Sequence, residues 1–579
     1  MTELFEPTGD HDRRLVHGVG GRLGWFNRAG VLSAVDVHVA TRTADLAGET
    51  DEQVLLAAAL ATRAVRNGSV GVDVQTIRHI APELPWPDPA EWTAAVGSSA
   101  LLSSGVLRQE LGLVYLDRYH RLERQIADDV LTRTAQPPPS VDEARLAEGL
   151  AQVSDAHLSD EQAEAALAAC RQWTTVVTGG PGTGKTTTVA RMLALLSTQA
   201  DQPLSVALSA PTGKAAARLA EAVTQELPAG FADRVGRPEA MTLHRLLGWR
   251  RDNQTRFRHD RGNRLKHDVI VVDECSMVDL TMMARLLEAV RPRTRLVLVG
   301  DPRQLTSVGA GAVLSDLVEG LPGVLVRELS RNYRSAPGIQ GVADALRDAE
   351  GHEGAEAVLA ALRSGSADVE FVETDEPAEV LRPGLVSHAL DVRRLAFEGR
   401  DQEAVATLGR HRLLCAHREG PHGVRTWNRL VEQWIGEESG DPIWSTWYVG
   451  RPLLVTANDH ALEIYNGETG VAVLDGGRLR ARIDGARRGL TDLAPGRLDA
   501  VDTMHALTIH KSQGSQAREV TVLLPEEGSR LLTRELFYTA VTRAQDRLRV
   551  VGSEAAVRAA VGTRAQRATG LRSRLADQP

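Results

Sequence analysis

The sequence predicts an α/β protein built on two parallel, doubly wound sheets. From residue 174 onward, short apolar strands alternate with segments of helical spacing, at 174–178, 204–208, 269–272 and 296–299. Such alternation is typical of strand–helix–strand units whose strands all run in the same direction. Apolar strands return at 412–415, 520–524 and 548–551. We therefore expect a second core of the same class later in the chain.

The 579 residues are enough for three or four domains of roughly 150 residues each. Helical spacing dominates the N-terminal region, a proline run follows it, and glycine-rich turns divide short apolar runs near residue 467. The expected parts are a helical N-terminal domain at 1–135, a linker at 136–158, a first core at 159–323, a second core at 324–445 and 501–579, and a small β-barrel-like insert at 446–500.

The composition is that of a soluble globular protein. The apolar share is 42%, the charged share is 25% and the formal net charge is −9, which excludes extensive disorder, collagen and coiled-coil rods. Cys170, Cys275 and Cys415 are too few and too far apart for a disulfide framework or a zinc site, which favours a reducing compartment. The acidic start does not match a signal peptide, and no apolar run approaches the ~20 residues of a membrane span. We expect a cytoplasmic protein.

Charge is distributed unevenly. The first 150 residues hold 21 acidic and 14 basic residues, a net charge of −7, so this region is a poor candidate for binding nucleic acid. Only four of the 67 basic residues are lysines, at positions 185, 214, 266 and 511. Lysine and arginine are not interchangeable where a compact ammonium group must reach one phosphate. The lysines therefore mark positions to compare with the motifs, although chance alone would also leave a few.

The strongest motif is a glycine-rich loop that directly follows the expected strand at 174–178. The loop reads Gly179-Gly180-Pro181-Gly182-Thr183-Gly184-Lys185-Thr186 and matches G-x-x-x-x-G-K-[ST]. In such a loop, backbone N–H groups wrap phosphates, the lysine reaches the β- and γ-phosphates and the threonine hydroxyl binds Mg²⁺. The helix that begins near Thr187 adds its N-terminal dipole. ATP and Mg²⁺ are therefore the expected ligands.

Two further strands end in polar residues. The strand at 269–272 ends in Asp273 and Glu274, which a doubly wound sheet would place beside the phosphate loop. Asp273 is expected to hold Mg²⁺, and Glu274 to orient and polarise the attacking water. The strand at 296–299 leads to Gln304, which is placed to sense the γ-phosphate. Taken alone, Gln304 is equally typical of an ordinary polar loop.

Together these motifs resemble those of superfamily 1 helicases. The first-core set is Gln162, the phosphate loop, 210–219, 242–248, Asp273-Glu274 and 300–304, and the second-core set is 332–335, 508–514 and 538–544. Within the superfamily the chain most resembles the RecD family, the alpha subunits of exodeoxyribonuclease V. This likeness rests on 212–219, 509–515, 465–470 and the arginine-rich 564–572. The resemblance implies two RecA-like P-loop cores.

The resemblance also implies a role for each matching residue. Gln162 would read the adenine, and 179–187 would hold the phosphates. Lys185, Glu274 and Gln304 would act in hydrolysis, joined by Arg334 and Arg543 as arginine fingers from the second core. Taken alone, either arginine is better explained by a surface ion pair, since arginine is abundant in this chain. The side chains that would contact the DNA strand are Thr212, Lys214, His244, His510, Ser512 and Gln513.

The implied activity is ATP-dependent 5′→3′ translocation on single-stranded DNA and helicase action at duplex ends. The chain would be one subunit of a heterotrimeric helicase–nuclease, with RecB-like and RecC-like partners, that processes double-strand breaks for recombinational repair. We find no cluster of acids with lysine that resembles a nuclease centre, so that centre is expected in a partner. Residues 1–135 are expected to dock protein, a plain structural cap being the alternative. The rival functions are a free-standing helicase of the same superfamily and a structural subunit with a vestigial nucleotide site.

The basic stretch 249–268 carries seven basic and three acidic residues. Apolar and basic residues alternate on both sides of Asp260-Arg261-Gly262-Asn263, which is a turn signal in which Gly262 could take a positive φ. This pattern predicts a hairpin that splits the duplex as a pin, with Phe257 or a neighbour at its tip contacting DNA. A disordered basic loop is the alternative.

Overall fold

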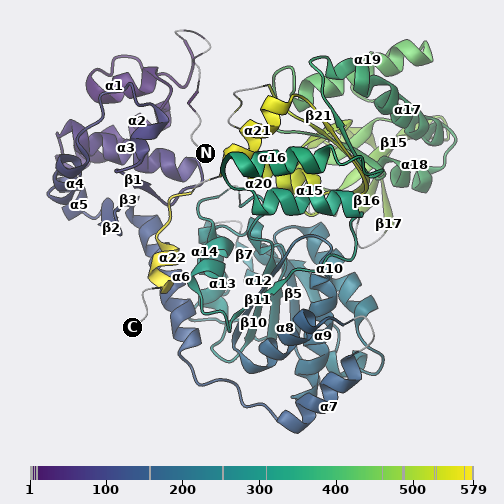
Figure 1. Cartoon of the computed structure of the whole chain (residues 1–579), viewed down its shortest axis with the longest axis horizontal. Helices are drawn as coiled ribbons and strands as arrows, with labels where there is room; N and C mark the ends of the chain where they lie inside the picture. Colours follow the sequence, from purple (N-terminus) through teal and green to yellow (C-terminus); the bar gives the residue numbers. More distant parts are fainter. Residues whose placement is uncertain are drawn as a thin grey trace.

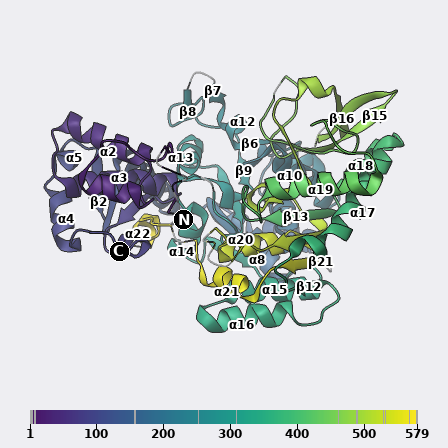
Figure 2. The same ribbon diagram turned by 90° about the horizontal axis from the view of Figure 1, so that it is seen from above.

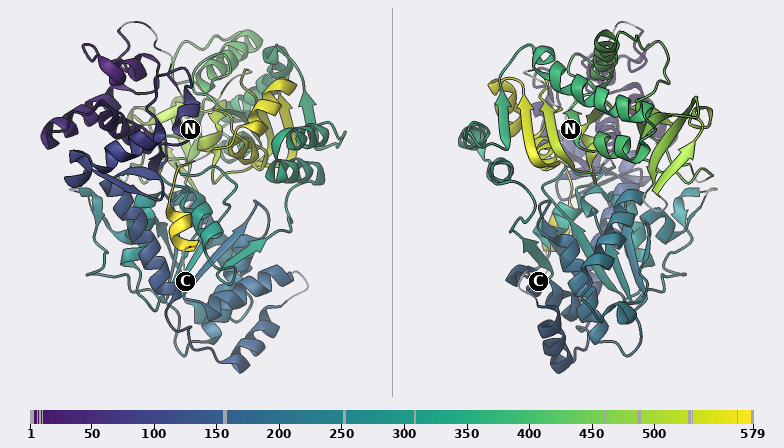
Figure 3. Two further views of the ribbon diagram at one scale, coloured as in Figure 1. Left: turned by 60° about the vertical axis from the view of Figure 1, so that its left-hand side comes forward. Right: turned by 90° about the vertical axis from the view of Figure 1, so that its right-hand side faces the viewer.

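The computed structural model describes residues 4–5, 7, 9, 11–154, 158–250, 253–307, 309–459, 461–485, 489–526, 529, 531–565 and 567–576. Within these residues the chain forms an N-terminal domain, two α/β cores and a small β domain (Figure 1). Figures 1 and 3 show the first core below the second, with the N-terminal domain at their side.

The N-terminal domain packs helices against a small antiparallel sheet. Its central helix, α3 (Glu52–Arg66), is alanine-rich and buried on most of its surface, and the Asp51 carboxylate caps its start. The other helices are α1 (Gly21–Arg28), α2 (Ala34–Ala47), α4 (Pro89–Gly97) and α5 (Ala100–Ser103). The sheet has the order β1 (Gly71–Asp73), β3 (Leu113–Leu116), β2 (Leu107–Glu110). The predicted helical N-terminal domain is confirmed. The small sheet was not predicted, because strands of three or four residues are too short to show a clear alternation.

Two helices lead from this domain to the first core. In α6 (Asp117–Thr134), Ile126 and Val130 pack in one apolar cluster with first-core residues such as Met283. In α7 (Glu143–Val153), Leu146 packs with residues of the first-core helix α9. The prediction of a linker over 136–158 is therefore wrong for most of its length. The proline run is followed by an amphipathic helix, whose apolar face is buried on the core.

The first core is a six-stranded parallel sheet covered by helices on both faces. The strand order is β11 (Val326–Leu329), β4 (Thr174–Gly179), β10 (Arg295–Gly300), β9 (Val269–Val272), β5 (Val206–Ala210), β6 (Glu239–Thr242). Successive residues point to opposite faces, so Val176 packs towards α6, α13 and α14, while Val177 packs towards α7, α8 and α9. The helices are α8 (Asp160–Arg171), α9 (Lys185–Thr198), α10 (Gly213–Glu226), α11 (Ala232–Val235), α12 (Leu243–Leu247), α13 (Leu280–Ala289) and α14 (Val313–Gly320).

The second core is a five-stranded parallel sheet with the order β12 (Val369–Val372), β21 (Ala544–Val551), β20 (Ala517–Leu523), β13 (His411–Cys415), β19 (Ala506–Thr508). Its helices are α15 (Pro337–Asp348), α16 (Gly351–Leu362), α17 (Pro377–Phe397), α18 (Asp401–Leu408), α19 (Val424–Ser439), α20 (Arg534–Val541) and α21 (Glu554–Gly562). The two cores together confirm the predicted α/β class with parallel sheets.

The insert is an antiparallel sheet with the order β17 (Gly489–Leu493), β16 (Arg478–Gly485), β15 (Thr469–Asp475), β14 (Pro452–Val455), β18 (Val501–Thr503). No pairing joins β17 to β18 in the described part of the sheet, so a closed barrel is not confirmed. The strand β18 also extends the sheet beyond the expected end at residue 500.

Two boundaries of the second core need correction. The strand β11, expected in the second core, pairs with β4 and completes the first sheet. The C-terminal helix α22 (Leu571–Ala576), also expected in the second core, packs between α14 and α6 (Figures 1 and 2). Both segments are short, and only tertiary packing decides which core buries them. No described helix is both long and apolar enough to cross a membrane.

The position of α22 makes Leu571 part of the first core, although it stands near the end of the chain. Its side chain is 0% exposed. We expect Leu571→Ala to lower the free energy of unfolding by about 2–5 kcal/mol, through lost burial and a residual cavity. Urea denaturation would show an earlier first transition. The control is Arg572→Ala, an exposed neighbour, and equal stability of the two variants would contradict the assignment.

Candidate functional site

The phosphate loop joins β4 to α9 at the carboxyl edge of the first sheet. Gly182 and Gly184 have φ angles of 84° and 78°, left-handed values that glycine adopts without strain. A Cβ atom on Gly182 would lie 2.5 Å from Asn332 Oδ1, and one on Gly184 would collide with the Gln162 amide. Glycine is therefore required here for two reasons, the turn itself and the close approach of Gln162 and Asn332.

Lys185 lies at the centre of the site. Its Nζ donates hydrogen bonds to the carbonyl oxygens of Gly179 and Gly180, both at 2.7 Å. Burial lowers the pKa of Lys185, and the negative charges of Asp301 and Asp273 oppose that effect. The ammonium group is thus folded back on the loop, where an incoming phosphate could take the place of the two carbonyl oxygens.

Asp273 and Glu274 follow β9 at the same edge. The Glu274 N–H donates to Asp273 Oδ1 at 2.8 Å, and Glu274 itself has a φ of 53°, which is uncommon for a residue with a side chain. Burial and the neighbouring Glu274 raise the pKa of Asp273 to about 6. Among the described ion pairs none joins Asp273 to a cation. The Asp273 carboxylate and the Thr186 hydroxyl are oxygen donors of the kind that suits a hard divalent cation.

A hydrogen-bond network joins the two cores beside this site. The loop after β10 contributes Asp301 and Gln304, and the turn between α20 and β21 contributes Arg543. Arg543 Nη2 donates to Gln304 Oε1 at 2.9 Å, and Gln304 Nε2 donates to Asp301 Oδ2 at 3.0 Å. The Tyr538 hydroxyl also donates to Asp301 Oδ2, at 3.2 Å. Burial lowers the pKa of Arg543, an effect that Glu274 and Asp301 oppose.

Asp301, Tyr538 and Thr539 were not predicted as site residues. Thr539 Oγ1 accepts a hydrogen bond from the backbone of Leu305 at 2.9 Å. The sequence signal for all three was present, since they lie inside or directly beside the quoted motifs, but only the fold shows that these motifs touch.

The segment after β11 passes directly over the phosphate loop. The Tyr333 N–H donates to Gly182 O at 2.9 Å, and Asn332 Nδ2 donates to Pro181 O at 3.0 Å. Gln162 is buried, with its amide 3.5 Å from Thr183 O. A cavity of about 290 Å³ opens beside the loop, lined by Gly180, Pro181, Thr183, Gln340, Tyr538 and other residues of both cores.

The two predicted arginine fingers lie in different environments. Arg543 is buried and faces the site, as described above. Arg334 is exposed, and its guanidinium donates to Gln516 Oε1 at 2.8 Å. The role of Arg334 stays a prediction, since this structure directs its guanidinium towards another residue of the second core.

The predicted DNA contacts of the first core follow the carboxyl ends of β5 and β6. Thr212 caps α10 by accepting from the Ala215 N–H at 3.2 Å. Burial lowers the pKa of Lys214 to about 8, with a smaller effect from Arg218. His244 is exposed at the surface. Arg218 Nη1 donates to Gly514 O at 2.9 Å, which brings this edge against the second-core motif.

The second-core DNA candidates are less uniform. His510 is part-buried, and burial lowers its pKa. Ser512 is 2% exposed and its hydroxyl donates to Ile509 O, so it does not face solvent. Gln513 Nε2 donates to Leu305 O at 2.9 Å and therefore links the two cores. These three roles stay predictions, and the present contacts of Ser512 and Gln513 do not favour them.

A groove with several basic side chains lies beside these residues. It has a volume of about 430 Å³, and its lining includes Arg418, Arg425, Arg429, Lys511 and Thr508. Lys511 pairs with Asp502 at 3.0 Å. Positive charge gathered beside Thr508 suits a phosphate backbone. No sequence signal marked the three arginines, because arginine is abundant throughout this chain.

The predicted pin is corrected by the structure. The strands at this point are β7 (Trp249–Arg250) and β8 (Asn253–Phe257), which pair antiparallel. The predicted turn does form, because the Asn263 N–H donates to Asp260 O at 3.2 Å. Within the described residues, however, no pair of strands flanks that turn. Gly262, which was expected to be able to take a positive φ, does not have one. Phe257 is 7% exposed and packs in the first core, so it is not a tip residue. The alternation of apolar and basic residues around Phe257 therefore reflects burial of one face. In this segment Trp249 is the exposed aromatic residue, with 41% of its surface exposed.

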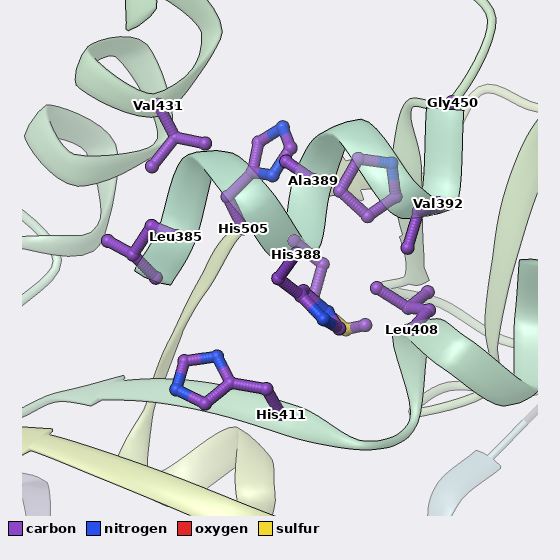
Figure 4. A pocket seen from close by; sticks show the side chains of 11 residues that line it. Leu385, His388, Ala389, Val392, Leu408, His411, Val431, Gly450 and His505 are labelled. Carbon is purple, nitrogen blue, oxygen red and sulfur yellow. The ribbon is translucent and has the colours of Figure 1, made fainter. Parts of the chain in front are cut away.

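A small cavity inside the second core is separate from the nucleotide site (Figure 4). It has room for about one water molecule, and His388, His411 and His505 line it. Burial lowers the pKa of His388 to about 4 and those of the other two to about 3. These histidines are therefore neutral packing residues at ordinary pH.

Two parallel cores that meet over a phosphate loop define a P-loop nucleotide-binding protein of the two-core helicase type. Family models agree: "AAA domain" matches residues 162–310, "UvrD-like helicase C-terminal domain" matches 503–551, and "RecBCD enzyme subunit RecD, N-terminal domain" matches 28–114. The RecBCD enzyme subunits RecD of Mycobacterium tuberculosis and Mycolicibacterium smegmatis are 55% and 56% identical to this chain, over 96% and 94% of it and 97% and 98% of their own lengths. The chain belongs to the RecD family.

A more distant relative is the ATP-dependent RecD2 DNA helicase of Deinococcus radiodurans. It is 32% identical over 80% of this chain, which spans 59% of that protein. The resemblance inferred from the motifs is thus confirmed across nearly the whole chain.

The rare lysines offer a matched test of the nucleotide site. Lys185→Ala removes a charge-assisted phosphate contact, so we expect ATP binding to weaken by about 1.5–3 kcal/mol, roughly 10–100-fold. Titration with a fluorescent ATP analogue measures this. Lys266, which is exposed away from the loop, is the control, and Lys266→Ala should bind as the parent does. Equal affinity of the two variants would remove Lys185 from the site.

The corrected hairpin makes a second prediction. Phe257→Ala should destabilise the first core by about 3–5 kcal/mol, as expected for a buried aromatic residue. Trp249→Ala should change stability by no more than about 0.5 kcal/mol, because the side chain is exposed. Thermal melting of both variants decides between a core role and a tip role for Phe257, and a stable Phe257→Ala variant would restore the tip assignment.

Proposed function

We propose that this chain is an ATP-dependent 5′→3′ single-strand DNA translocase and helicase, one subunit of a helicase–nuclease. Its partners would be RecB-like and RecC-like subunits, and the complex would process double-strand DNA breaks for recombinational repair in the cytoplasm. The observation that carries the proposal is the contact between Arg543 and Gln304 beside Lys185, because it connects a nucleotide site to both moving parts of a motor. The relatives named above, which cover nearly the whole chain, support the subunit assignment.

The geometry supports a separate role in ATP hydrolysis for each of these residues. Lys185 would exchange its loop carbonyls for the β- and γ-phosphate oxygens. Glu274 would hold the attacking water, and Arg543 would stabilise the charge that develops on the γ-phosphoryl oxygens. Thr186 and Asp273 would hold Mg²⁺, which would neutralise phosphate charge. Gln304, which is bonded to Arg543, would pass the state of the γ-phosphate to the loop that ends at Leu305.

Movement along DNA would follow from the same contacts. Nucleotide would draw Arg543 and Lys185 towards the phosphates and close the cores, and product release would relax them. Thr212, Lys214 and His244 on the first core, and His510 with the basic groove on the second, would hold successive phosphates. Contacts with phosphates fix position without reading sequence, as a motor requires.

A free-standing helicase is the second candidate, favoured by the similarity to the RecD2 helicase. A vestigial nucleotide site is disfavoured, because Lys185, Asp273, Glu274 and Arg543 are all in place. The two candidates differ in whether strand separation requires partner subunits.

The test is ATP hydrolysis by the full chain, alone and in its complex, with single-stranded DNA of several sequences. Hydrolysis should be stimulated by DNA and nearly abolished by Glu274→Gln, with binding of ATP retained. Affinity for DNA should be insensitive to sequence and should fall with salt, with a slope of about 0.7 per phosphate contact. DNA-independent hydrolysis, or affinity that ignores salt, would refute the motor assignment. Unwinding by the purified chain alone would favour the free-standing helicase.

A further inference from the structure

Residues 563–565 and 567–576 form a strap that connects all three large parts of the molecule. The strap leaves the second core after α21, where the Arg534 N–H donates to Thr563 O at 2.9 Å. It then crosses to the N-terminal domain and ends as α22 beside α6 (Figures 1 and 2). The Val70 N–H donates to Ala568 O at 2.8 Å, so the strap pairs directly with the N-terminal domain.

Arg567 is the centre of this crossing. Its Nη1 donates to Gly309 O at 2.8 Å and to Gly311 O at 2.9 Å, and its Nη2 donates to Ser307 O at 2.5 Å. One planar guanidinium therefore gathers three carbonyl oxygens from a single loop of the first core. A lysine ammonium group carries its donors on one atom and cannot reproduce this fork.

The N-terminal domain contacts the same guanidinium from Gly68. A Cβ atom on Gly68 would lie 2.8 Å from Arg567 Cζ, and the φ of Gly68 is +87°. The Gly311 N–H donates to Gly68 O at 2.9 Å. The loop, the strap and the N-terminal domain thus meet at one point, which leaves no room for a side chain at position 68.

The loop held by Arg567 continues directly from the γ-phosphate sensor. Gln304 and Leu305 precede Ser307 in the chain, and Leu305 is bonded to Thr539 and Gln513 of the second core. Arg567 also lies close enough to His510 for its positive charge to lower the pKa of that histidine, after the larger effect of burial. A displacement of Arg567 would therefore reach both the nucleotide sensor and the second-core motif.

The positive charge of Arg567 requires polar partners at this part-buried position. The side chain is part-buried, and among the described residues no carboxylate forms an ion pair with it. A cation removed from water is costly unless dipoles or counter-charges replace its hydration. Here the replacement is the three loop carbonyls, so the loop and the guanidinium hold each other in place.

We propose that Arg567 is a positioning residue that locks residues 305–307 and 309–311 to the N-terminal domain, so that the placement of this domain controls hydrolysis stimulated by DNA. The consequence for hydrolysis rests on the proposed function, whereas the lock itself does not. A protein bound to the N-terminal domain would thereby act on the motor through the strap, without touching nucleotide or DNA.

The test pairs two substitutions that are distant in sequence. Arg567→Ala removes the fork, and Gly68→Ala pushes the guanidinium away from the N-terminal domain. Each should lower the DNA-stimulated kcat about five- to tenfold, the size of a typical coupling between sites, with the rate without DNA within about twofold of the parent. The double variant should be no worse than either single one, because both break the same contact.

Two controls separate this effect from strain and from charge. Gly48→Ala imposes a similar left-handed strain at φ +71° in the same domain, but its Cβ would meet no atom within 4 Å. It should leave the stimulated kcat unchanged. Arg567→Lys keeps the charge near His510 without the fork and should behave as Arg567→Ala. A Gly68→Ala variant indistinguishable from Gly48→Ala, additive losses, or full rescue by lysine would overturn the proposal.

Hydrogen exchange supplies a readout that does not depend on activity. Arg567→Ala and Gly68→Ala should both speed amide exchange across 305–311, and at Gly311 in particular, whereas Gly48→Ala should not. If the parent chain showed no DNA-stimulated hydrolysis, the proposed function would fall, and exchange would still decide whether the lock exists. Unchanged exchange in both variants would refute the lock whatever the rates.

Discussion

The buried guanidinium of Arg543 is the constraint on which the arrangement of the two cores depends. Away from water, it needs acceptors in fixed directions, and it takes them from Thr539, Ser515 and Gln304 at 2.9–3.3 Å. Thr539 and Ser515 belong to the same core as Arg543, whereas Gln304 belongs to the other core. The contact with Gln304 is therefore the acceptor that Arg543 loses if the cores separate. Lys185 is in a similar position, because its present acceptors are neutral carbonyls of its own loop. A triphosphate would offer both cations anionic oxygens, which are stronger acceptors. Nucleotide binding and the separation of the cores are therefore linked by competition for the same donors.

The local chemistry of the site was predictable from sequence. A phosphate loop is defined by neighbouring residues, and the strand preceding it sets its direction, so Gly179–Thr186 could be placed without a structure. Asp273 and Glu274 were likewise placed by the strand that ends in them. The contact between Gln304 and Arg543 spans 239 positions of the chain, and only the packing of one core on the other creates it. The same limit explains why Asp301 and Tyr538 were passed over.

The errors have a common physical origin. Apolar residues between basic ones predicted a hairpin with Phe257 or a neighbour at its tip. The same alternation arises when one face of a segment is buried, and Phe257 packs in the first core. The segments β11 and α22 are too short to show which core buries them. In each case the sequence pattern was present, but the sequence did not show which distant segment packs against it. The lysine skew was more reliable, because Lys185, Lys214 and Lys511 do lie in the phosphate loop or at the two edges proposed for DNA.

The docking of the strap shows that the N-terminal domain is built into the motor rather than attached to it. The carboxylate of Glu123, in α6, is fully buried and accepts hydrogen bonds from Tyr115, Thr569, Gly570 and Arg574 at 3.0–3.2 Å. Three of these four donors belong to the strap. A buried carboxylate stripped of most of its donors would be strongly destabilising, so the strap cannot leave while α6 stays in place. Any movement of the second core is therefore transmitted along the strap to a domain that is itself anchored to the first core through α6. The first core, the second core and the N-terminal domain are thus each connected to the other two. Opening the nucleotide site between the cores therefore requires a shift of the strap or of the N-terminal domain.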